Sequence, residues 1–358
     1  MSATLSFATA IDRLGLRSLV AFAANMALRG RGGGGQRFSV DDRGRWVNAQ
    51  PHATIVSPTI HTVPLADMRD TVLDNWCWQY LPKAGDVVID VGAGVGEEAV
   101  VFSGFVGPAG RVVSIEAHPE TFECLRNTIE RSSLTNVTAL PYAVTDQLGE
   151  VRIHDQRNHL ANSIISAGKD GGETVVSTTL DAVAEELKLG PVAMLKMNIE
   201  GAERSAVRGM ETLSRNLRYV VISCHDFIAD RGAGGEEFRT FDDVRARLES
   251  LGFETICRAD HALPWVRGYI LHVADRTRAP GARDLRRRTC SEHCTERVAY
   301  PEVRSIWCGD CLELRSRGVE LSYVGLCQTH GGHRCVGNCP AAADRNYSFL
   351  KKRMLLRS

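Results

Sequence analysis

The stretch DVVIDVGAGVG, from Asp86 to Gly96, joins an apolar run to a glycine-rich turn. Its apolar positions are nearly continuous rather than alternating: Val87, Val88, Ile89 and Val91. A continuous run is typical of a parallel strand that helices cover on both faces. The glycines that follow allow a tight reversal and a close approach of a ligand to the backbone. The stretch therefore predicts the first strand and the ligand-binding loop of a doubly wound α/β sheet.

Acidic residues lie on both sides of this loop. Asp90 interrupts the strand near its end, and Glu97 and Glu98 open the helix that follows. A helix N-terminus that carries two acids would repel a pyrophosphate, so the loop does not suit a phosphate-rich cofactor. A cationic sulfonium ligand with an amino-acid tail matches these charges better.

A second apolar strand, RVVSIE from Arg111 to Glu116, ends in an acid. A carboxylate that binds a ribose is expected roughly 20 residues beyond the glycines in nucleotide-binding folds of this kind. Glu116 stands at about that distance, so we predict that it contacts a ribose.

Several motifs, taken in order, resemble the S-adenosylmethionine-dependent methyltransferases and, more narrowly, the FkbM-like family. They are VVIDVGAGVGEE (87–98), VVSIEAHPETFECLRNTI (112–129), PYAVTD (141–146), TTLDAV (178–183) and LKMNIEGAE (195–203). The resemblance covers roughly residues 81–273. It implies a Rossmann-like methyltransferase sheet with an antiparallel last strand, S-adenosylmethionine as cofactor, and methyl transfer to a hydroxyl of a small molecule or sugar. A nitrogen acceptor is the alternative that the residues leave open.

Carried over residue by residue, the resemblance implies a cofactor site at the carboxyl ends of the first strands. Ala143 and Val144 would flank the adenine. Asp146 would bond the adenine amine, although an acid before a Gln-Leu-Gly turn is equally explained by turn chemistry. The full expected cofactor set is Asp90, Gly92, Ala93, Gly94, Gly96, Glu97, Glu116, Ala117, Ala143, Val144, Asp146 and Asn198.

Three residues are the candidates for catalysis: His225, Asn198 and Lys196. Family members usually have Asp where this chain has Asn198, so a carboxylate that would act as a base or metal ligand is missing there. An amide still donates and accepts hydrogen bonds. We expect His225 to act as a general base, because a neutral imidazole accepts a hydroxyl proton near pH 7. The alternative is a histidine that caps a strand end.

The chain divides into five parts by composition and pattern. Residues 1–36 predict an amphipathic helix and a glycine-rich linker, and the helix would dock on the core, dimerise or lie on a membrane surface. Residues 37–80 predict a cap region whose helix, 67–80, covers the cofactor pocket. Residues 81–275 predict the methyltransferase domain. A basic linker at 276–289 leads to a cysteine-rich tail at 290–358.

The tail leaves two interpretations open. Its C-x3-C and C-x2-C spacings allow a structural zinc site at Cys290, Cys294, Cys308 and Cys311. Its many arginines and glycines and its few apolar clusters equally suit a poorly ordered extension that binds nothing.

The composition agrees with a soluble globular enzyme, which we expect to be cytoplasmic. The chain has 358 residues, 44% of them hydrophobic, and a formal net charge of +0. Charge balance removes the usual electrostatic argument for a nucleic-acid partner. The sequence does not indicate an oligomeric state. The rival hypothesis is a non-catalytic cofactor- or partner-binding protein, in which Asn198 marks a lost catalytic edge and the cysteine-rich tail makes the important contact.

Overall fold

The computed structural model describes residues 15–29, 35–77, 80–153, 172–230, 232, 235–257 and 270–273, together with the backbone of 297–298, 307–308, 323–327 and 333–336. Predictions that concern other residues lie outside the described part of the chain. These include the expected linker at 276–289.

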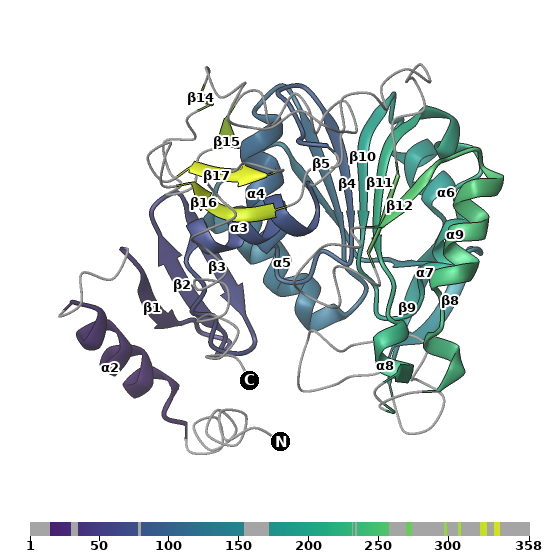
Figure 1. The fold of residues 1–358 in the computed structure, drawn as a ribbon. Coiled ribbons are helices and arrows are strands. Elements are labelled where there is room, and N and C mark those ends of the chain that lie inside the picture. Colours follow the sequence, from purple (N-terminus) through teal and green to yellow (C-terminus); the bar gives the residue numbers. More distant parts are fainter. Residues whose placement is uncertain are drawn as a thin grey trace.

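A sheet of seven strands forms the centre of the molecule (Figure 1). Its strand order is β12 (Thr255–Cys257), β13 (Ile270–Val273), β11 (Leu217–Ser223), β10 (Val192–Met197), β4 (Val87–Val91), β5 (Arg111–Ile115) and β6 (Val137–Leu140). The strands from β11 to β6 pair in parallel, whereas β13 runs antiparallel to both of its neighbours. The predicted doubly wound sheet with an antiparallel last strand is therefore confirmed.

Helices cover both faces of this sheet (Figure 1). On one face α3 (Leu65–Asn75) packs with α4 (Glu97–Val106), and on the other lie α6 (Leu180–Glu186), α7 (Glu203–Ala206) and α9 (Phe241–Ser250). Neighbouring residues of β4 point to opposite faces of the sheet. Val88 packs in the core beneath α3 and α4, Ile89 packs in the core beneath α6, α7 and α9, and both are fully buried. This double burial explains why the strand is apolar without alternation.

Shorter elements surround the central sheet. Strands β7 (Ala143–Val144), β9 (Glu173–Thr178) and β8 (Gly149–Ile153) form a small sheet in that order. One helical turn, α8 (Asp226–Asp230), follows β11. The backbone of β14 (Arg297–Val298), β15 (Trp307–Cys308), β17 (His333–Val336) and β16 (Tyr323–Cys327) forms a four-stranded sheet in that order.

The N-terminal helix α2 (Arg17–Arg29) docks on an antiparallel meander of β1 (Arg37–Val40), β2 (Trp46–Gln50) and β3 (Ala53–Ser57). Ala21 of the helix shares a small buried cluster with Phe38 and Trp46. The Asn25 amide also binds the backbone of Phe38, donating to its carbonyl over 2.7 Å and accepting from its N–H over 2.8 Å. Every helix among the described residues is too short or too polar to cross a lipid bilayer.

Side chains of α5 (Pro119–Arg131) and of the residue after it fasten this meander to the main domain. Strand β3 is an edge strand, so part of its backbone has no partner strand. The Val56 N–H donates to Thr128 Oγ1 over 3.0 Å, and the Thr54 N–H donates to Ser132 Oγ over 2.9 Å. The Ser132 hydroxyl donates back to the Thr54 carbonyl over 3.1 Å. Hydroxyl groups thus take the place of a fourth strand.

We expect Thr128→Val to lower the free energy of unfolding by about 1–3 kcal/mol, because it leaves the buried Val56 N–H without an acceptor while preserving side-chain shape. Urea denaturation followed by circular dichroism measures the change. Thr135→Val, on the exposed side of the next turn, is the control and should stay within about 0.5 kcal/mol of wild type. Equal effects of the two substitutions would contradict the role given to Thr128.

Candidate functional site

The glycine-rich loop leaves β4 at the carboxyl edge of the sheet and passes directly over the end of β10. Gly92 and Gly94 have φ values of 72° and 56°, in the left-handed region that glycine tolerates best. A Cβ atom at Gly92 would lie 2.0 Å from the Asn198 carbonyl oxygen, whereas at Gly94 it would meet nothing within 4 Å. Gly92 therefore permits the crossing of the two strand ends, and Gly94 leaves open space.

A buried ion pair holds these two strand ends together. Lys196 Nζ of β10 lies 2.8 Å from Asp90 Oδ1 of β4, and both side chains are almost completely buried. The ammonium also donates to the Gly92 carbonyl over 2.9 Å. Burial opposes the charged form of Lys196, but the charges of Asp90, Glu98 and Glu116 outweigh it and keep its pKa above the ordinary value. Lys196 thus fixes the start of the glycine loop against the end of β10.

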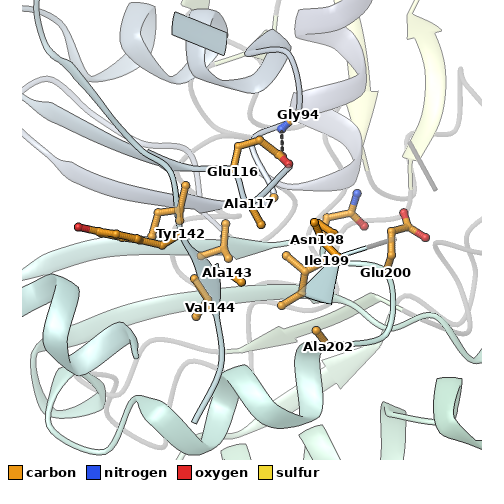
Figure 2. A pocket seen from close by; sticks show the side chains of 14 residues that line it. Gly94, Glu116, Ala117, Tyr142, Ala143, Val144, Asn198, Ile199, Glu200 and Ala202 are labelled. Atoms are coloured by element: carbon orange, nitrogen blue, oxygen red, sulfur yellow. Dashed lines mark hydrogen bonds between the residues drawn. The ribbon is translucent and has the colours of Figure 1, made fainter. Parts of the chain in front are cut away.

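Glu116, at the end of β5, faces the loop. Its Oε2 accepts a hydrogen bond from the Gly94 N–H and its Oε1 accepts one from the His118 N–H, each over 2.9 Å. Burial raises the pKa of this carboxyl to about 7, although the two N–H donors act in the opposite direction. Figure 2 shows the Glu116 carboxylate beside Gly94 at the pocket. Each oxygen keeps acceptor capacity for a ligand.

A pocket opens between the loop and the ends of β5 and β10 (Figure 2). Among the described residues, its lining consists of Val91, Gly92, Gly94, Ile115, Glu116, Ala117, Tyr142, Ala143, Val144, Ile153, Asn198, Ile199, Glu200 and Ala202. The structure therefore brings together most of the residues that the sequence assigns to the cofactor.

Other residues of the expected cofactor set lie behind this lining. Asp90 is buried under the loop, and Ala93 packs with Ala99 and Leu125. Gly96 faces α5, where a Cβ atom would lie 2.9 Å from Leu125 Cδ1.

Glu97 and Asp146 of that set both have protein partners. Glu97 pairs with His61 of the cap region, and Asp146 Oδ1 accepts from the Ser205 hydroxyl over 2.8 Å. Direct contact of these side chains with a cofactor stays a prediction.

His225 follows β11 and lies between two carboxylates. Its Nδ1 is 2.6 Å from Glu203 Oε1, and its Nε2 is 3.2 Å from Glu200 Oε1. Burial lowers the pKa of this imidazole, but the Glu203 charge and the two hydrogen bonds outweigh burial and raise it to about 10. The expectation of a neutral base near pH 7 is therefore corrected, because the two carboxylates hold the ring as a cation. A role of His225 in catalysis stays a prediction.

Sequence reasoning missed two groups of residues. The first group lines the pocket without having been assigned to it: Val91, Ile115, Tyr142, Ile153, Ile199, Glu200 and Ala202. Three of these stand in the same LKMNIEGAE motif as Asn198, so that motif was the available signal. The other group comes from the cap: His61 reaches Glu97, and the Trp76 ring centroid lies 5.3 Å from Lys196 Nζ. No local pattern marks such long-range contacts.

The expected zinc ligands are not among the described side chains. Cys290, Cys294 and Cys311 lie outside the described residues, and only the backbone of Cys308 is described, in β15.

A family model described as "Methyltransferase FkbM domain" matches residues 90–255. This range contains the glycine loop, Glu116, Asn198 and His225. Residues 90–255 form a methyltransferase domain of the FkbM family. The resemblance inferred from the motifs is thereby confirmed.

Two curated relatives are similar to parts of this FkbM domain. One is the hexuronic acid methyltransferase AglP of Haloferax volcanii, 24% identical over 140 residues, which are 39% of this chain and 56% of that protein. The other is a protein-L-isoaspartate O-methyltransferase of Methanococcus aeolicus, 31% identical over 126 residues, which are 33% of this chain and 57% of that protein. The chain thus spans a little over half the length of these relatives.

Solved structures with a similar fold include a methyltransferase FkbM from Methylobacillus flagellatus, with 18% identity, a TM-score of 0.41, and coverage of 57% of this chain and 47% of that one. Fibrillarin from Aeropyrum pernix, in complex with S-adenosylmethionine, has 16% identity, a TM-score of 0.36, and coverage of 66% of this chain and 97% of that one.

We expect Lys196→Met to destabilise the FkbM domain by about 3–5 kcal/mol, because it leaves the Asp90 carboxylate buried without its counter-charge. Thermal and urea denaturation measure this loss. Lys83→Met, at an exposed position, should change the unfolding free energy by less than about 0.5 kcal/mol. Adding Asp90→Asn to Lys196→Met should recover part of the loss, since neighbouring sites that share a partner are not additive. A double variant whose loss of unfolding free energy equals or exceeds the sum of the two single losses would contradict the pairing.

The protonation of His225 should make the stability of the domain depend on pH. Its folded pKa of about 10 lies above the ordinary value of 6.5, so its contribution is complete below about pH 6.5 and is lost as the pH rises towards 10. We therefore expect the stability difference between wild type and His225→Gln to shrink from pH 6.5 to 10 in urea titrations. Thr135→Val, which removes no titratable group from an exposed position, should show no such trend. A difference that stays constant over this range would show that the imidazole does not carry the charge.

Proposed function

We propose that the FkbM domain transfers a methyl group from S-adenosylmethionine to a hydroxyl oxygen of a small molecule or sugar. The observation that carries this proposal is the position of Glu116, whose carboxylate lies at the pocket wall and is fixed by the N–H groups of Gly94 and His118. A carboxylate at the end of the second strand is the group that binds ribose hydroxyls in nucleotide sites of this architecture.

The shape and polarity of the pocket fit the parts of S-adenosylmethionine. Tyr142, Ala143 and Val144 line one end with small and aromatic surface, which suits an adenine ring (Figure 2). Gly94, where a side chain would meet open space, leaves room beside Glu116 for the ribose and the amino-acid tail. Asn198 lies towards the other end with Glu200.

The charges of the site favour a cationic ligand over a phosphate. Glu116 and Glu200 line the pocket, and the ammonium of Lys196 is already committed to Asp90 and to the Gly92 carbonyl. The helix α4, which starts at the loop, carries Glu97 and Glu98 in its first turn. A pyrophosphate would meet repulsion from these acids, whereas a sulfonium and an α-ammonium group would be attracted.

The chemistry asks little of the protein beyond alignment. S-adenosylmethionine supplies a methyl group that is already activated by the sulfonium charge. The protein must hold the acceptor oxygen in line with the methyl group and exclude water. Asn198, whose amide both donates and accepts, lines the pocket at the end where the acceptor would enter and is suited to orient a hydroxyl.

The acceptor class rests on similarity to relatives. The hexuronic acid methyltransferase is a sugar-modifying enzyme by name, and this chain is similar to 56% of it. This likeness supports a sugar or another small hydroxyl compound as the acceptor.

Calorimetric titration with S-adenosylmethionine and S-adenosylhomocysteine tests the cofactor site. We expect wild type to bind both, and Glu116→Ala to weaken both by about 10- to 100-fold, because each hydrogen bond to a charged group contributes about 1.5–3 kcal/mol. Glu130→Gln, at an exposed position of α5, is the matched control and should bind as wild type does. Failure of the folded wild-type protein to bind either compound would overturn the proposed function.

A further inference from the structure

Glu200 adopts a backbone conformation that a non-glycine residue rarely takes. Its φ is 51°, in the left-handed region, and it is followed by Gly201 with a φ of 100°. Such a conformation costs energy and is found mainly where the surrounding structure and a function require it. Glu200 also lines the pocket, and its carboxylate lies on the same side as the Asn198 amide, away from the end formed by Tyr142 (Figure 2).

A chain of polar groups fixes the Glu200 carboxylate from behind. Its Oε1 lies 3.2 Å from His225 Nε2, and the other ring nitrogen of His225 lies 2.6 Å from Glu203 Oε1. Glu203 is in turn fully buried, and it accepts hydrogen bonds from the Gly201 N–H over 3.1 Å and from the Thr240 hydroxyl over 3.2 Å. This row of polar groups therefore runs from the core to the pocket wall and ends on the Glu200 carboxylate, whose side chain is 21% exposed.

We propose that Glu200 contacts the acceptor hydroxyl and takes its proton as the methyl group is transferred; this inference rests on the function proposed above. His225 then acts as a positioning residue for Glu200 rather than as the base itself. It suits that role because its pKa of about 10 leaves it already protonated at neutral pH.

The proposed step balances in atoms and in charge. A bond forms between the acceptor oxygen and the methyl carbon, the bond from that carbon to sulfur breaks, and sulfur keeps the electron pair. The hydroxyl proton passes to a carboxylate oxygen of Glu200, which later returns it to water. A sulfonium and a carboxylate are thus replaced by a neutral thioether and a neutral carboxylic acid. The net charge of the pocket therefore does not change during the transfer itself, which matters where water is excluded.

This arrangement also favours one class of acceptor. A neutral hydroxyl donates a hydrogen bond to Glu200 and loses its proton there. An ionised carboxyl group offers no proton and would be repelled by the Glu200 carboxylate at hydrogen-bond distance. The site should therefore select hydroxyl acceptors against carboxylate acceptors.

The first test compares the affinities for S-adenosylmethionine and S-adenosylhomocysteine, which differ in the sulfonium charge but share the α-ammonium group. In Glu200→Gln we expect binding of S-adenosylmethionine to weaken by about fivefold or more, because the nearby counter-charge is removed. Binding of S-adenosylhomocysteine should change by less than about twofold. Glu130→Gln, which removes an exposed carboxylate, should leave both affinities unchanged.

Two further variants separate the loss of the Glu200 charge from a loss of folding. Glu200→Asp keeps the charge and should retain most of the preference for the sulfonium compound. Glu200→Gly removes the carboxylate and suits the left-handed conformation, so it should fold with a melting temperature close to that of wild type and lose the preference as Glu200→Gln does. An unchanged ratio of the two affinities in folded Glu200→Gln would overturn the inference. Failure of wild type to bind either compound would instead overturn the proposed function.

The second test measures turnover, with methyl glucopyranoside as the first hydroxyl probe. On this sugar we expect Glu200→Gln to lower kcat by about 100-fold or more, the range in which a general base contributes. Wild-type kcat in Glu200→Gln would overturn the proton-transfer role. If wild type does not methylate this sugar, the ratio of affinities decides the inference alone.

Discussion

The buried pair between Asp90 and Lys196 is the interaction on which the rest of the site depends. The pair joins the adjacent strands β4 and β10 close to the point where each strand ends. The same Lys196 ammonium also donates to the Gly92 carbonyl. Two charges cost much free energy to bury, so such a pair is a poor source of stability. Its value lies in geometry, because neither the glycine loop nor the end of β10 can move without uncovering a charge.

A second cation repeats this arrangement further along the same edge. His225 lies between Glu203 in the core and Glu200 at the pocket, as Lys196 lies between Asp90 and the loop. In both places a buried cation lets carboxylates gather where their mutual repulsion would otherwise be prohibitive. The result is a pocket with acidic walls, built for a positively charged ligand, in a chain whose formal net charge is +0. The local field, not the overall charge, therefore matters for recognition.

The sequence predicted the central sheet well, because a parallel strand buried on both faces leaves a strong local signature in runs such as Val87 to Val91. It also placed Glu116 correctly beside the loop, since the spacing between glycines and acid follows from the length of one helix and one strand. It could not foresee that His225 would be charged. The charged state depends on Glu203, which lies 22 positions earlier in the sequence. It also depends on the left-handed backbone of Glu200, a conformation that the residue type does not predict.

The sequence predicted a cap helix over the pocket, whereas α3 packs against α4 and contributes no described residue to the pocket lining. Long-range packing decides this placement, and no local pattern marks it. The cap lies before the matched range of 90–255, yet two of its side chains contact residues that flank the cofactor loop. His61 pairs with Glu97 at the start of α4, and the Trp76 ring lies 5.3 Å from Lys196 Nζ of β10. An aromatic face near a buried ammonium supplies attraction without adding another charge. The Val56 N–H of the cap in turn donates to Thr128 Oγ1 of the domain. The cap and the domain therefore hold each other in place. Residues outside the matched domain therefore pack against both sides of the cofactor loop, and a fragment cut at the start of that domain would lose these neighbours of Glu97 and Lys196.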